Sequence, residues 1–153
     1  MAHMNQSKKA AIAPQIKAVL KKYRTKGTVA VRHYSTLVVN ISESELDLVG
    51  AANRWNAYIA ERRSYAQRYV VEDNFDVNPY HEVNNMREIG EDTIADFYEE
   101  LIAAMNGAGT DFANYDNSDI QTDYFDVGWY VDINVGKWNK PFVYTGEAQL
   151  EAA

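Results

Sequence analysis

The sequence predicts an α+β fold, in which an antiparallel β-sheet of about four to five strands has two to three helices packed on one face. Residues 127–135 alternate apolar and polar side chains, which is the pattern of a half-buried strand. Residues 94–105 repeat apolar side chains at helical spacing. The expected order of elements is α-β-β-α-β-α-(short α)-β-β, which favours an antiparallel sheet whose second face stays open.

Each element follows from a local pattern. The expected segments, in order, are a helix at 13–23, a hairpin of 28–34 and 36–42, a helix at 51–63, extended chain at 69–71 and 75–79, a helix from about 92 to 106, and strands at 127–135 and 142–145. Pro14 suits an early helical position, where its missing N–H matters little. We expect the hairpin register to bury Val31 beside Val39. Pro79 should end its strand or place it at an edge, and residues 81–88 are expected to form a polar loop.

The 153 residues fit a single domain. Residues 1–6 and 147–153 are expected to be disordered, and residues 43–71 are interpreted as an insertion. The chain has no cysteine, so neither a disulfide nor a thiolate metal site is available. It has no apolar run near the length of about 20 residues that a membrane span needs. We therefore expect a soluble protein of the cytoplasm.

Charges are distributed unevenly along the chain. The net charge is −7, yet residues 1–42 carry eight Lys and Arg side chains and no acidic residue, so the remainder carries −15. The two regions either neutralise each other within the fold or form separate surfaces, of which the basic one would suit nucleic acid. The residues expected on such a basic surface are Lys17, Lys21, Lys22, Lys26 and Arg32. The acidic total argues against a protein devoted to binding DNA phosphates.

The alternation of the strands predicts a polar patch on the open sheet face. If the valines and isoleucines of each strand point into the core, the side chains between them point the other way. The residues predicted on this face are Arg32, Asn40, Asp76, Asn78, Asp132 and Asn134. Such a face is either ordinary solvated sheet surface or a binding or catalytic patch, and in an enzyme Asp76 and Asp132 would be the acid/base pair.

A cluster of acidic side chains precedes the strand at 127–135. Carboxylates of this kind can hold a hard cation, but their spacing does not match a calcium-binding loop. The three histidines are not spaced as metal ligands, and no glycine-rich loop has the context of a nucleotide site, so we expect no metal and no cofactor. The cluster is either a solvated surface or a contact surface for a partner. The expected contact residues are Asp116, Asp119, Asp123, Tyr124 and Asp126.

Several stretches together resemble small uncharacterised accessory proteins of tailed bacteriophages and related mobile elements. They are IAPQIKAVLKKY, GTVAVRHYSTLVV, ELIAAM, NSDIQTDYFD and YVDINVGKWNKP. The resemblance covers most of the chain except about residues 43–71. It implies an accessory viral gene product and supplies no catalytic residues.

Three functions follow as hypotheses. The leading one is a phage accessory protein that binds a host macromolecule without catalysis, as an inhibitor of a host defence or of host machinery. The partner would then be a host protein and the location the host cytoplasm. The alternatives are a nucleic-acid-binding module that uses the basic N-terminal helix, and an enzyme that uses Asp76 and Asp132.

Overall fold

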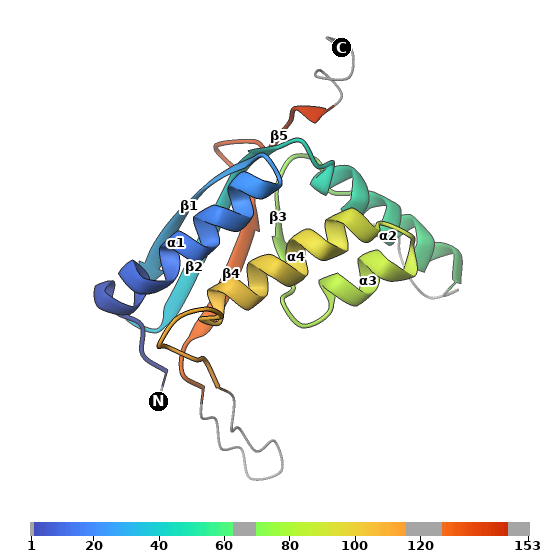
Figure 1. Ribbon diagram of the computed structural model, residues 1–153. Coiled ribbons are helices and arrows are strands. Elements are labelled where there is room, and N and C mark those ends of the chain that lie inside the picture. Colours follow the sequence, from blue (N-terminus) through green and yellow to red (C-terminus); the bar gives the residue numbers. More distant parts are fainter. Residues whose placement is uncertain (1, 63–69, 116–126, 147–153) are drawn as a thin grey trace.

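A computed structural model describes residues 2–62, 70–115 and 127–146 of the chain. These residues form four α-helices and a five-stranded sheet, which confirms the α+β fold class (Figure 1). The elements are α1 (Gln6–Lys22), β1 (Thr25–Arg32), β2 (Thr36–Ser44), α2 (Leu48–Arg62), β3 (Phe75–Val77), α3 (Glu82–Glu88), α4 (Asp92–Met105), β4 (Tyr130–Val135) and β5 (Val143–Tyr144). Helices α1 and α4 lie over one face of the sheet, and α2 and α3 lie beside α4, away from β1 (Figure 1).

The sheet is mixed and not wholly antiparallel, which corrects the prediction. Its strand order is β1-β2-β4-β3, and β5 pairs with the end of β2. The β1–β2 and β3–β4 pairs are antiparallel, whereas β4 and β5 both run parallel to β2. A parallel neighbour requires a long crossover connection, and the segment from α2 to α4 supplies it. No strand pattern in the sequence reveals which strands become neighbours across such a crossover.

The β1–β2 hairpin forms as predicted but in a different register. Val31 lies opposite Leu37, and Val29 lies opposite Val39. The turn is tight: the Ser35 N–H donates to the Arg32 carbonyl at 3.2 Å, and His33 and Tyr34 have φ values of 55° and 57°. This left-handed pair is the geometry that matches the twist of two adjoining strands. Both residues of the turn are therefore exposed.

Residues 3–6 belong to the fold, contrary to the expectation that residues 1–6 are disordered. Met4 is fully buried, and its N–H donates to the Tyr34 carbonyl at 2.7 Å. The Asn5 side chain then caps α1 by accepting from the Lys8 N–H at 2.8 Å, so the helix begins well before residue 13. Pro14 lies inside α1 on its exposed side, where water can reach the carbonyl that a proline leaves without a partner.

The middle of the chain contributes more structure than predicted. α2 begins three residues earlier than expected, and its Leu48 and Ala51 are buried in the core, so this part of residues 43–71 is integral to the domain. Residues 82–88 form α3 and not a loop, because Met86 is fully buried among the core side chains. The prediction for Pro79 is confirmed, since β3 ends at Val77.

Candidate functional site

The structure places five of the six predicted patch residues on the sheet face that points away from α1 and α4. Asp76 lies opposite Asn134, and Asn134 lies opposite Asn40, with an Asn134 Nδ2–Asn40 Oδ1 hydrogen bond of 3.0 Å. The sixth residue, Asn78, has left the sheet, because its side chain accepts from the Tyr80 N–H at 2.9 Å in the turn that follows β3. Asn78 therefore does not belong to the patch.

An ion pair spans this open face. Arg32 Nη2 lies 2.9 Å from Asp132 Oδ2, although the two residues are on β1 and β4, with β2 between them. The pair crosses β2 at Val38, which is only 5% exposed although it belongs to the open face. Arg32 and Asp132 thus satisfy each other, and neither Asp76 nor Asp132 lines either of the two pockets described below. This arrangement favours a structural role for the patch over acid/base chemistry.

The predicted basic residues are divided among three places. Lys17, Lys21 and Lys26 line a groove of about 790 Å³ between the end of α1 and the start of β1. The groove also holds Glu43, and the Lys26 ammonium lies 3.0 Å from its carboxylate. Lys22 instead lies 2.6 Å from Glu100 on α4, and Arg32 is on the open sheet face. The positive charge of this region is therefore partly neutralised within the domain.

The predicted acidic contact residues Asp116, Asp119, Asp123, Tyr124 and Asp126 lie outside the described residues. The two residues that flank this segment, Tyr115 and Val127, both line a pocket of about 320 Å³. We call it the edge pocket, because it lies along one edge of β4. The residues that line it are Pro79, Tyr80, Ile102, Asn106, Asn114, Tyr115, Val127, Trp129, Tyr130 and Val131.

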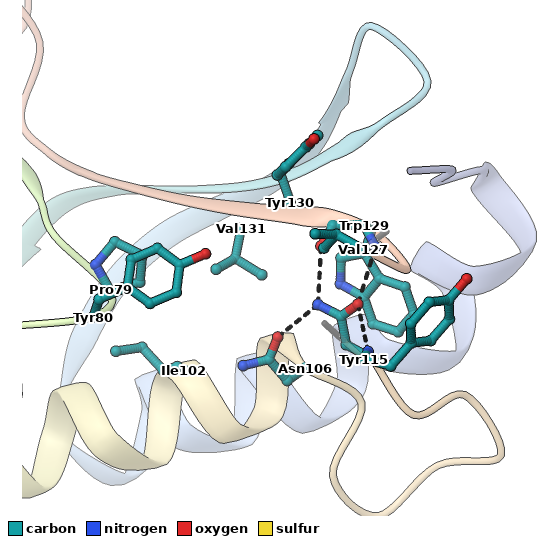
Figure 2. A pocket seen from close by; sticks show the side chains of 10 residues that line it. Pro79, Tyr80, Ile102, Asn106, Tyr115, Val127, Trp129, Tyr130 and Val131 are labelled. Atoms are coloured by element: carbon teal, nitrogen blue, oxygen red, sulfur yellow. Dashed lines mark hydrogen bonds between the residues drawn. The ribbon is translucent and has the colours of Figure 1, made fainter. Parts of the chain in front are cut away.

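The edge pocket opens between β4 and the C-terminal end of α4. Figure 2 shows Val131 of β4 facing Ile102 of α4 across it, with Tyr80 at one end and Tyr115 at the other. The side chain of Tyr130 points away from Ile102, to the opposite side of β4. Tyr80, Tyr115 and Tyr130 are 73%, 47% and 45% exposed, whereas Ile102 and Val131 are half-buried. The pocket therefore has an apolar interior and exposed aromatic side chains around it.

The carboxamide of Asn114 holds the pocket wall together. Its Oδ1 accepts from the Trp129 N–H at 3.0 Å, and its Nδ2 donates to the Trp129 carbonyl at 2.9 Å. The same Nδ2 donates to Asn106 Oδ1 at 2.8 Å, which ties β4 to the end of α4 (Figure 2). Gly128 makes this close approach possible, because a Cβ there would lie 2.6 Å from Asn114 Oδ1.

A half-buried carboxyl lies on the neighbouring helix. Glu82 is in the first turn of α3, and burial raises the pKa of its carboxyl from 4.5 to about 7. Tyr98 of α4 is buried, and that burial, together with the charge of Glu82, raises the pKa of its phenol well above 10. Glu82 does not line the edge pocket, so we expect its ionisation to affect the stability of the fold and not binding at the pocket.

Sequence reasoning missed the edge pocket itself and the role of Asn114 in its wall. The Asn78-Pro79 pair does predict a turn, but the sequence does not show that this turn leaves β4 partly uncovered. Asn114 belongs to no recognisable sequence motif, since its role depends on hydrogen bonds to the backbone of Trp129, 15 residues further along the chain. Among the described residues, no group of His, Asp or Glu is arranged to hold a metal ion, and no helix is long and apolar enough to span a membrane.

No protein-family model, curated protein or solved structure matches this chain.

Proposed function

We propose that this protein acts by binding a macromolecular partner at the edge pocket, without catalysis. The observation that carries the proposal is the pair of exposed aromatic side chains, Tyr80 and Tyr115, at the two ends of an apolar pocket. Tyrosine is enriched among the residues that dominate binding energy at protein interfaces, because it buries a large area with little loss of conformational freedom. Concave apolar sites of this kind are also the usual places for a bound group.

Charge supports a protein partner with a basic surface. The sequence between Tyr115 and Val127, which both line the edge pocket, contains four aspartates and no basic residue. Its aspartates would attract a basic partner and speed the encounter at low salt. The resemblance to phage accessory proteins suggests that this partner is a host protein of a defence or of essential host machinery.

Capture from a lysate of the bacterial host, with and without nuclease, tests the proposal. The tagged protein should retain a host protein in stoichiometric amount after nuclease treatment. Alanine at Tyr80 or Tyr115 should weaken its binding about 10-fold or more, which is typical of an interface hot spot. Trp138→Ala is the matched control, because Trp138 is 87% exposed and lies away from the pocket in the turn between β4 and β5. Equal loss in the control and in both tyrosine variants would contradict the proposal.

The groove beside Lys17 and Lys21 supports a second candidate, a nucleic-acid-binding module. Lys17 and Lys21 line it together with Arg24 and Lys26. Such binding would weaken steeply with salt, with a log–log slope of roughly −0.7 to −0.9 for each phosphate neutralised. Recovery of nucleic acid alone, lost on nuclease treatment and weakened in the double variant of Lys17 and Lys21 to glutamine, would favour this candidate.

A further inference from the structure

In the part of the chain that the structure describes, the edge of β4 that faces β3 has a gap of one residue. Tyr130 and Gly136 direct their N–H groups toward the β2 side, where they donate to Ser35 at 2.9 Å and to Ile41 at 2.8 Å. Successive residues of a strand direct their backbone groups to alternate sides. The N–H and C=O of Val131 therefore point the other way, toward the β3 side.

The positions on both sides of Val131 are occupied. Ile133 lies opposite Val77 in the β3–β4 pairing. Trp129 has its N–H and C=O bonded to the carboxamide of Asn114. Both neighbours of Val131 on this edge thus have partners, one from a strand and one from a side chain.

Pro79 explains why Val131, which lies opposite Leu37 of β2 on its other side, has no strand partner on the β3 side among the described residues. Since Val77 pairs with Ile133, the same antiparallel register would place Pro79 opposite Val131. A proline has no N–H to donate to the Val131 carbonyl. The chain instead turns at Asn78, where the Glu82 N–H donates to the Asn78 carbonyl at 3.0 Å. Within the described part of the chain, no residue bonds to the N–H or C=O of Val131 on this side.

The Val131 N–H and C=O, which have no partner on this side among the described residues, border the edge pocket. Val131 is one of the residues that line it, and in Figure 2 Tyr80 and Pro79 lie on one side of Val131 with Ile102 below. One donor and one acceptor at a pocket of about 320 Å³ form a specific recognition pattern. A group that binds there must offer an acceptor and a donor side by side. A primary carboxamide does so: that of Asn114 pairs in this way with the N–H and C=O of Trp129, two residues before Val131.

We propose that the edge pocket binds the side-chain carboxamide of an asparagine or glutamine of the partner protein. Its oxygen accepts from the Val131 N–H and its nitrogen donates to the Val131 carbonyl, which repeats the pairing of Asn114 with Trp129. The methylene groups of the incoming side chain pack against Ile102 and Tyr80. A longer strand does not fit, because Asn114 and the turn at Pro79 close both ends of the gap. This inference rests on the proposed function and names the group that the partner inserts.

Titration with small amides tests the inference without knowledge of the partner. The probe is butyramide, added to isotope-labelled full-length protein and followed by the NMR signal of each backbone N–H. We expect a saturable shift of the Val131 signal, with a dissociation constant on the order of millimolar for so small a ligand. N,N-dimethylbutyramide lacks the donor and butyrate lacks it as well, so neither should produce this shift. An equal shift with either compound, or no shift with butyramide, overturns the inference.

Hydrogen exchange of the free protein provides an independent check. The Val131 N–H should exchange much faster than the Ile133 N–H, because only Ile133 is paired. Equal protection of both would mean that another part of the chain already occupies the gap, and this would overturn the inference. The two proposals fail separately. If a host protein is captured but butyramide causes no shift, the proposed function stands and the carboxamide inference is wrong. If butyramide binds but no host protein is captured, the carboxamide site stands and the proposed function is wrong.

Discussion

Replacing Asn114 by alanine should lower the free energy of unfolding by about 2–4 kcal/mol. The carboxamide makes four hydrogen bonds: with the N–H and C=O of Trp129, with Asn106, and with the N–H of Tyr115. Trp129 is only 2% exposed, so alanine leaves a buried N–H and a buried carbonyl without partners. Each such group costs about 1–3 kcal/mol, and water entering through the edge pocket keeps the sum toward the lower end.

The prediction can be checked by urea unfolding followed by far-ultraviolet circular dichroism. For a chain of this size, 1 kcal/mol corresponds to about 2–4 °C in the midpoint of thermal unfolding, so a parallel thermal scan should show a loss of about 4–16 °C. Asn84→Ala is the matched control, because Asn84 is an exposed residue of α3, and a change within about 0.5 kcal/mol is expected there. If Asn114→Ala also changed stability by less than about 0.5 kcal/mol, the assignment of Asn114 as the support of Trp129 would be wrong.

Three further predictions concern stability. The pKa of the Glu82 carboxyl is raised from 4.5 to about 7 in the folded protein, so the stability that its protonated form contributes is retained below pH 4.5 and lost as the pH rises to about 7. Glu82→Gln should therefore stabilise the protein at pH 8 by at most about 3 kcal/mol and have little effect at pH 4, as measured by urea unfolding at each pH. Gly128→Ala places a Cβ 2.6 Å from Asn114 Oδ1 and 3.2 Å from the Tyr115 ring, and should destabilise by about 1–3 kcal/mol in the same assay; unchanged stability would show that the pocket wall is not close-packed. Met4→Ala should lower the free energy of unfolding by about 2–5 kcal/mol because Met4 is fully buried. Unchanged stability by calorimetry would instead support the original expectation that the N-terminus is disordered.

The fold could be predicted wherever one short-range pattern decided the structure. The alternation at residues 127–135 and the helical spacing at residues 94–105 each reflect burial of one face, which is a property of the local sequence. The N-terminus and α3 were missed because their burial depends on distant contacts. Met4 packs in the core and its N–H donates to the Tyr34 carbonyl, in a turn about 30 residues further along the chain.

The candidate site was less predictable than the fold. The alternation of side chains along the strands correctly placed Arg32 and Asp132 on one face. It could not show that they form an ion pair across β2 and so neutralise each other. The gap at Val131 depends on the β3–β4 register, on Pro79 and on the Asn114 carboxamide, which lie far apart in the sequence. Register across long connections is a tertiary property, so no local pattern encodes it.

The same proline has a consequence for how the protein behaves at high concentration. A long unpaired strand edge is a template on which other chains can add, and it promotes aggregation. Because Pro79 and Asn114 confine the unpaired stretch of this β4 edge to Val131 among the described residues, an extended segment of another chain would gain too few backbone hydrogen bonds at this edge to start a fibril. A threonine at position 79 would restore the missing donor and let β3 lengthen. The resulting chain would have a more complete sheet and would lose the opening beside Ile102.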